Sequence, residues 1–129
     1  MLILRHYHDT PLERESLVFF MEYGIKKTKF ISENVTVVII CSGSVFPHDD
    51  IKLVDNVVVI ERENVGLEFG GYMEALSKFD WASSYDIVVM INGTLLGPLF
   101  PLQRLGEDWL SHFTSLLSNH TRLAGITIN

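Results

Sequence analysis

Two polar segments, each following an apolar run, carry the residue types best able to bind a ligand. Asn64-Val65-Gly66-Leu67-Glu68 follows the run 57–60, and Asn92-Gly93-Thr94 follows the run 87–91. Their amide, hydroxyl and carboxylate groups can hydrogen-bond phosphates, sugar hydroxyls or metal-bound water. In open α/β sheets, ligands bind just beyond the carboxyl ends of the strands. Two such junctions separated by one expected helix predict a nucleotide-type site.

Three glycines, Gly66, Gly70 and Gly71, flank or enter the helix expected after the first junction. A glycine inside a helix costs about 1 kcal/mol relative to alanine. That cost is typical of positions where a ligand or another backbone approaches closely. Helix–sheet packing and ligand binding explain these glycines equally well. Their spacing fits neither the GxGxxG fingerprint nor a P-loop.

A third polar loop, His6 to Asp9, follows the first apolar run and includes His8. Alternate strand residues share a face, so an HxH pair can bind a metal. No third ligand is identifiable, and a lone pair more often packs or caps. We expect this loop to contact a nucleotide, because its strand should be central. The sequence has no nucleophile-elbow motif and no Ser-His-Asp or Cys-His set, so the catalytic residues stay unknown.

The elements expected to position these residues alternate between strand and helix. The expected strands are 2–7, 34–41, 57–60, 86–91 and 122–128, the expected helices are 11–23, 67–78 and 107–118, and 93–106 is expected to be irregular. Thr10 should cap the first helix, with Pro11 and Glu13 in its first turn and Gly24 at its end. Phe69, Met73 and Leu76 should form one side of the second helix. The pattern predicts an α/β fold with a mostly parallel sheet, helices on both faces, and strand order 3-2-1-4.

Composition limits the classes of partner. The chain has 129 residues, 47% of them hydrophobic, and a net charge of -6, which suits a single domain. It has no basic stripe, so we expect no nucleic acid partner. It has no apolar run long enough for a transmembrane segment, and we expect a cytoplasmic or membrane-peripheral location. The single cysteine, Cys41, should be a buried, inert thiol.

Taken together, the junctions resemble the rhamnan synthesis protein F family of glycosyltransferase-like proteins. That family has an Asn-x-Gly-x-Asp-Phe-Gly-type segment, then an apolar strand ending in Asn-Asp-Ser or Asn-Ser-Ser, then Gly-Pro. Here the corresponding segments are Asn64 to Gly71, Asn92-Gly93-Thr94, and Gly97-Pro98. The sequence differs in having Glu68 where Asp is usual and no acid at 92–94.

The resemblance implies the Rossmann-like, nucleotide-sugar-binding half of a GT-A fold, over residues 1–129 as one domain. It implies that Asn92 and Thr94 contact the donor diphosphate or a metal shell, and that Asn64, Gly66 and Glu68 contact the nucleotide. GT-A proteins commonly bind Mn²⁺ or Mg²⁺ through Asp-x-Asp, a motif this sequence lacks. The implied partners are a nucleotide-sugar donor and a glycan acceptor, and we expect further chain or a partner protein to complete the fold.

Two alternatives remain open at the level of sequence. The first is a non-catalytic GT-A-like module that binds or scaffolds without the metal-binding acid. The second is a different doubly wound protein, such as a response-regulator-like or flavodoxin-like domain. The latter would need an acidic cluster or a phosphate-binding loop after the first strand, and Asp9 alone does not supply it.

Overall fold

The computed structural model describes residues 1–27, 35–97 and 108–126. The strands are β1 (Leu2–Tyr7), β2 (Thr36–Ser42), β3 (Val57–Arg62) and β4 (Val88–Ile91). The helices are α1 (Pro11–Phe19), the π-helical segment η1 (Phe20–Lys26), α2 (Leu67–Lys78), α3 (Trp81–Ser84) and α4 (Ser111–Thr114).

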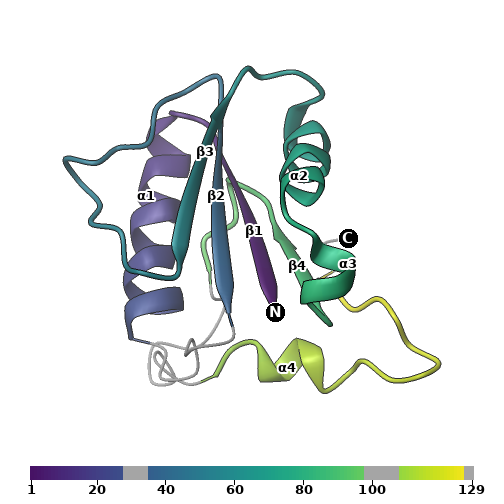
Figure 1. Ribbon diagram of the computed structural model, residues 1–129. Coiled ribbons are helices and arrows are strands. Elements are labelled where there is room, and N and C mark those ends of the chain that lie inside the picture. The colour runs from purple at the N-terminus through teal and green to yellow at the C-terminus, as the bar shows by residue number, and fades with distance from the viewer. Residues whose placement is uncertain (28–34, 98–107, 127–129) are drawn as a thin grey trace.

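The described strands form one fully parallel sheet in the order β3-β2-β1-β4 (Figure 1). The predicted α/β class and strand order are therefore confirmed. β1 is central and buried along its whole length, as expected for a parallel strand covered on both faces. The chain leaves β1 toward β2 on one side and returns to β4 on the other. The carboxyl ends of β1 and β4 thus form the topological switch point of the sheet.

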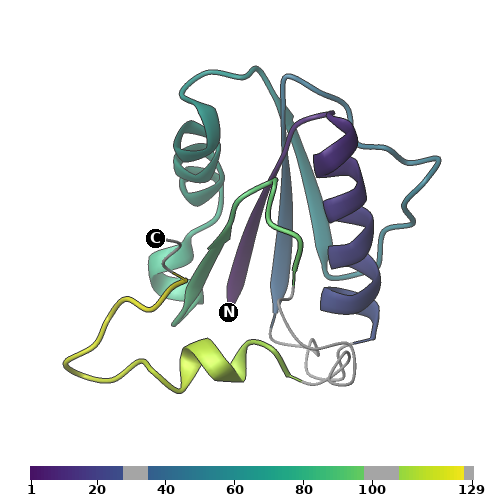
Figure 2. The same ribbon diagram turned by 180° about the vertical axis from the view of Figure 1, so that it is seen from behind.

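Helices cover both faces of the sheet, which also confirms the prediction. α1 and η1 pack on one face and α2 on the other, as the views from the two sides show (Figures 1 and 2). Leu17, Phe20 and Met21 enter the core on the α1 side, whereas Tyr72 and Ala75 enter the core on the α2 side. The sheet therefore holds its strand ends between two packed layers.

The start of α1 matches the sequence prediction, but its end does not. Thr10 Oγ1 accepts a hydrogen bond from the backbone N–H of Glu13 at 3.2 Å, and Pro11 is the first helical residue. Gly24 does not end the helix, because the chain continues as η1 to Lys26. The Gly24 carbonyl accepts a hydrogen bond from Trp109 Nε1 at 3.1 Å, and this tertiary contact supports a continued helical turn.

The orientation of α2 differs from the prediction. Its buried residues are Gly71, Tyr72 and Ala75, whereas Phe69 and Met73 are exposed. A Cβ at Gly71 would lie 3.0 Å from Ile40 Cγ2, so the missing side chain lets the helix approach the sheet closely. The predicted apolar side is therefore wrong for Phe69 and Met73, and close packing of small residues decided the rotation.

The last expected elements are only partly present. Within the predicted helix 107–118, the structure has the four-residue helix α4, and residue 107 lies outside the described residues. Residues 121–126 form no strand, so the predicted fifth strand is wrong there, and its remainder at 127–128 is outside the description. Leu123 is 90% exposed, so this segment lacks the packing that would fix a strand. The stretch 98–106, expected to be irregular, and Asn34, the expected start of β2, are also not described.

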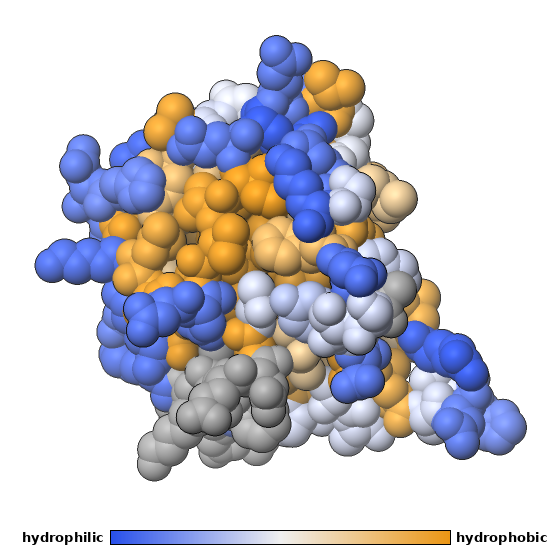
Figure 3. Space-filling view, viewed as in Figure 1, coloured by the Kyte–Doolittle hydropathy of each residue, from blue (hydrophilic) through white to orange (hydrophobic). Residues whose placement is uncertain are grey.

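Apolar side chains reach the surface between α1 and α2, over the edge strand β3 (Figure 3). Val58 on this strand is 40% exposed. Among the helices in the described ranges, none has the length and apolar character needed to cross a bilayer.

Candidate functional site

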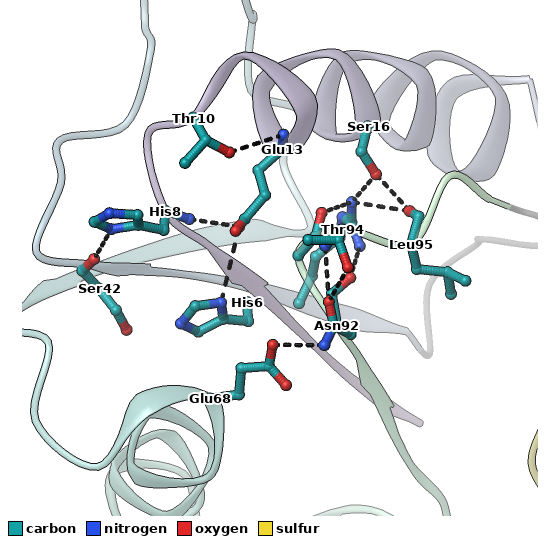
Figure 4. A network of polar contacts seen from close by, with 12 residues as sticks. His6, His8, Thr10, Glu13, Ser16, Ser42, Glu68, Asn92, Thr94 and Leu95 are labelled. Carbon is teal, nitrogen blue, oxygen red and sulfur yellow. Dashed lines mark hydrogen bonds and ion pairs between the residues drawn. The ribbon is translucent and has the colours of Figure 1, made fainter. Parts of the chain in front are cut away.

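The two polar junctions meet at the switch point. β4 pairs in register with β1 up to Ile91 opposite Arg5, so the residues that follow, Asn92 and His6, are level with each other. Glu68 approaches from the first turn of α2, and Asn92 Nδ2 donates a hydrogen bond to Glu68 Oε1 at 2.5 Å (Figure 4). The structure thus joins the loops around 64–71 and 92–94, as the sequence predicts.

Asn92 also fixes the turn that follows β4. Its Oδ1 accepts hydrogen bonds from the backbone N–H of Thr94 at 2.8 Å and from Thr94 Oγ1 at 2.7 Å. Asn92 and Thr94 are both exposed. The side chain of Asn92 therefore bridges two elements: its oxygen accepts hydrogen bonds within its own turn, and its nitrogen donates one to Glu68 of α2.

Glu13, which the sequence assigned only to the first turn of α1, belongs to the site. Its side chain is largely buried, and its Oε2 accepts a hydrogen bond from the backbone N–H of His8 at 2.7 Å. The same oxygen lies 3.9 Å from His6 Nδ1. A Cβ at Gly93 would lie 2.0 Å from Glu13 Oε2. Gly93 is thus glycine because a carboxylate occupies the space that a side chain there would need.

Arg5 supports the turn 92–95 from its buried side. It is 1% exposed, and its guanidinium donates to the carbonyl oxygens of Asn92 (2.7 Å), Gly93 (3.2 Å) and Leu95 (3.3 Å), and to Ser16 Oγ (2.6 Å). Burial lowers the pKa of Arg5 to about 10. Since its donors are directed at carbonyls, Arg5 positions the loop and is not presented to a ligand.

The loop 64–66 is held by its own contacts. Gly66 (φ 75°), which caps α2, and Leu67 (φ 53°), its first residue, both adopt left-handed conformations, and a non-glycine residue in this conformation is strained. Arg62 Nη2 donates to the Val65 carbonyl at 2.7 Å. A Cβ at Gly70 would lie 2.2 Å from that same oxygen. Close packing therefore explains Gly70, as it does Gly71.

Asn64 and His8 lie at the neighbouring part of the rim. A Cβ at Gly43 would be 3.1 Å from Asn64 Cβ and 3.8 Å from His8 Cε1, so these residues are close neighbours. His8 Nδ1 is 2.7 Å from the Ser42 carbonyl oxygen. Asn64 and Gly66 are exposed. The predicted residues thus form one continuous rim, from Asn64 and His8 to Glu68 and Asn92.

His6 is the electrostatically unusual member of the site. It is 6% exposed, and neither ring nitrogen forms a hydrogen bond. Burial lowers the pKa of His6, although Glu13 and Glu68 favour its protonated form. A neutral imidazole, with one donor and one acceptor, therefore sits between two carboxylates (Figure 4).

The residues at 92–94 do not fit a divalent metal ion. Mn²⁺ and Mg²⁺ prefer carboxylate oxygens, and here Asn92 Oδ1 is already bound by Thr94 while Gly93 has no room for an acid. In the described parts of the chain, no three His, Cys, Asp or Glu side chains are grouped to hold a metal.

Two residues of the site were not predicted from sequence. Arg5 had a signal, because a charged residue within the apolar run 2–7 must find buried hydrogen-bond partners. Glu13 had none, because a glutamate in the first turn of a helix is fully explained by capping and the helix dipole. Cys41 is buried as predicted, and its burial raises the pKa of the thiol to about 12.

These features define the class of the protein: an α/β domain of Rossmann-like type, with polar side chains gathered at the switch point of its sheet. The family model described as rhamnan synthesis protein F matches residues 37–112, more than half of the chain. The chain therefore belongs to the rhamnan synthesis protein F family, which points to a role in polysaccharide synthesis. Comparison with curated proteins gave no match, and neither did comparison with solved structures.

Proposed function

We propose that this domain binds a nucleotide-sugar donor for sugar transfer to a glycan or polysaccharide acceptor, using a GT-A-like arrangement. Family membership supports the polysaccharide context. The Rossmann-like sheet supports a ligand at the carboxyl ends of its strands, where such folds bind nucleotides.

One observation carries the proposal, namely the hydrogen bond between Asn92 and Glu68. It joins the ends of two separate structural units, the β4 turn and the α2 start, directly at the switch point. A polar bridge that remains exposed contributes little to stability, because water competes for its groups. Placing such groups at this edge is better explained by recognition of a polar ligand.

The proposed ligand extends along the rim. Asn64, Gly66 and His8 form the nucleotide side, and Glu68, Asn92 and Thr94 form the other end, with His6 beneath them. Gly70, Gly71 and Gly93 shape the rim by allowing close packing. Because residues 92–94 do not fit a metal, the proposed binding depends on hydrogen-bonding side chains and backbone groups of the chain itself.

Isothermal titration calorimetry tests this function. The folded chain is titrated with a panel of nucleoside diphosphates and nucleotide-sugars, with and without Mn²⁺. We expect a saturable heat of binding. Asn92→Ala should weaken the affinity by about tenfold, which is the effect of one good hydrogen bond. The matched control is Asn119→Ala, an exposed asparagine far from the rim in sequence. Absence of heat with every ligand would refute the proposal.

A non-catalytic binding or scaffold module is the second candidate. The specific observation in its favour is that Glu13 fills the space where an acid at position 93 would stand. An assay for sugar transfer, or for hydrolysis of the donor, separates the two. Ligand binding without either reaction, in a chain extended as far as its reading frame allows, would favour the module.

A further inference from the structure

The end of the rim formed by His6, Glu13, Glu68 and Asn92, here called the acceptor cluster, is rich in hydrogen-bond acceptors and poor in positive charge. Two carboxylates flank His6, one from each helix layer (Figure 4). The exposed bridge between Asn92 and Glu68 closes the cluster toward solvent. A ligand that binds here meets carboxylate oxygens first.

The guanidinium groups nearest to the cluster are directed at backbone carbonyls and at side chains outside it. Arg5 donates to carbonyl oxygens of the turn 92–95 and to Ser16. Arg62 donates to Glu74, to Ser42 Oγ and to the Val65 carbonyl. In the described part of the chain, no guanidinium or ammonium group is hydrogen-bonded to the side chain of Glu68, Asn92 or Thr94. A diphosphate placed here would face two carboxylates, and like charges at short range repel.

His6 supplies an independent sign that the cluster is built for a ligand. Its ring is more than nine-tenths buried, and both nitrogens lack hydrogen bonds. Buried polar groups in proteins almost always have partners. The imidazole offers one donor and one acceptor, and a hydroxyl group offers the same pair. Hydroxyl groups on a sugar ring therefore match His6, and the two carboxylates match their O–H donors.

We propose that the acceptor cluster binds hydroxyl groups of a sugar ring, with Glu68 as the main acceptor, and that it does not bind the diphosphate. Hydroxyls of the bound ring take the place of the Asn92 amide at Glu68 and open the bridge toward His6. The proposal deepens the donor-binding function and rests on it. It assigns Asn92 to sugar recognition instead of the diphosphate contact that the family resemblance implies.

Glu68→Gln is the central test, because it removes the charge and keeps the shape. The matched control is Glu63→Gln, which removes the same charge from an exposed residue in the loop that precedes α2. Dissociation constants are measured for a nucleotide-sugar, its nucleoside diphosphate, the 2′-deoxynucleoside diphosphate and inorganic pyrophosphate. Circular dichroism and thermal unfolding confirm that each variant is folded.

We expect Glu68→Gln to weaken binding of the nucleotide-sugar by about tenfold or more, because hydrogen bonds to a charged acceptor are roughly twice as strong as neutral ones. Pyrophosphate should bind the Glu68→Gln and Glu63→Gln variants equally well. A loss shared by the nucleoside diphosphate, but not by its 2′-deoxy form, would place the ribose in the cluster. A loss confined to the nucleotide-sugar would place the transferred sugar there.

The opposite result overturns the proposal. If Glu68→Gln strengthens binding of pyrophosphate or the nucleoside diphosphate more than Glu63→Gln does, the cluster faces phosphate. If no nucleotide ligand binds the native chain, the donor-binding function fails, and methyl glycosides then test the cluster alone. If a glycoside gives saturation-transfer NMR signals with the native chain and Glu68→Gln abolishes them, the proposal that the cluster binds sugar is retained. If no glycoside gives a signal, that proposal is rejected.

Discussion

Gly93 provides the sharpest test of how the site is built. An added Cβ there would lie 2.0 Å from Glu13 Oε2 and 2.6 Å from Glu13 Cδ, well inside contact distance. The backbone oxygen of His6, at 3.1 Å, leaves little room on the other side. Gly93→Ala must therefore move the Glu13 carboxylate away from the His8 N–H that binds it at 2.7 Å.

The magnitude follows from the lost hydrogen bond. A hydrogen bond to a charged group contributes about 1.5–3 kcal/mol. Replacing glycine by alanine reduces the conformational entropy of the unfolded chain, which stabilises the folded state by about 0.4–1 kcal/mol. This gain applies at Gly93, because its φ is not positive and alanine can adopt its backbone conformation. We expect a net loss of about 1–2 kcal/mol. In a Glu13→Ala background the obstruction is gone, so adding Gly93→Ala should cost less than about 0.5 kcal/mol.

A double-mutant cycle measured by urea unfolding checks this expectation. With a slope of about 1–3 kcal/mol per molar urea, the single Gly93→Ala change should lower the midpoint by roughly 0.3–2 M. Gly125→Ala is the control, because nothing lies within 4 Å of a Cβ at that position. If the two substitutions at 93 and 13 prove additive, the carboxylate is not what excludes a side chain, and the reasoning fails.

Three further outcomes follow from the same geometry. Because the folded pKa of His6 is lowered while the unfolded value is about 6.5, the unfolded state takes up the proton first as pH falls. Stability should therefore decrease below pH 6.5, and His6→Gln should flatten that profile in urea unfolding at pH 5–7.5. Cys41, with its pKa raised to about 12, should not react with a thiol reagent at pH 8 until urea unfolds the chain; fast native labelling would contradict its burial. Gly70→Ala should destabilise more than Gly71→Ala in thermal unfolding, because its Cβ would meet the Val65 carbonyl at 2.2 Å whereas Gly71 meets a side-chain methyl at 3.0 Å; the reverse order would show that the loop yields easily.

The parts of the fold predicted correctly from sequence depend on short-range patterns. The apolar run that became β2 could only be a strand covered on both faces, and the alternation of strands and helices then required parallel pairing. Right-handed crossovers reduce the possible orders to few, and β3-β2-β1-β4 is one of those that place β1 in the interior of the sheet. The bounds of α2, Leu67–Lys78, also agree, because polar and glycine residues mark its start.

The parts that failed depend on contacts between distant segments. Periodicity placed Phe69 and Met73 toward the core, but the fit of Gly71 against Ile40 turned α2 so that both are exposed. The sequence predicts a strand over 122–128, yet a strand forms only against a partner edge, and the sequence does not say whether such an edge is within reach of 122–126. Gly24 suggested a helix end, but Trp109, 85 residues away, binds its carbonyl.

The candidate site shows the same division between local patterns, which predict correctly, and contacts between distant segments, which sequence does not reveal. The sequence correctly joined the junctions at Glu68 and Asn92, because parallel strands end at a common edge. The family resemblance leads one to expect a further acid at 92–94, where this sequence has Gly93. The structure shows that the carboxylate at this point comes from Glu13, on the opposite layer, and that Gly93 is small in order to admit it. The missing acid at position 93 and the buried Glu13 of α1 are therefore one feature, and an acid substituted at 93 would displace Glu13 before it could bind a metal.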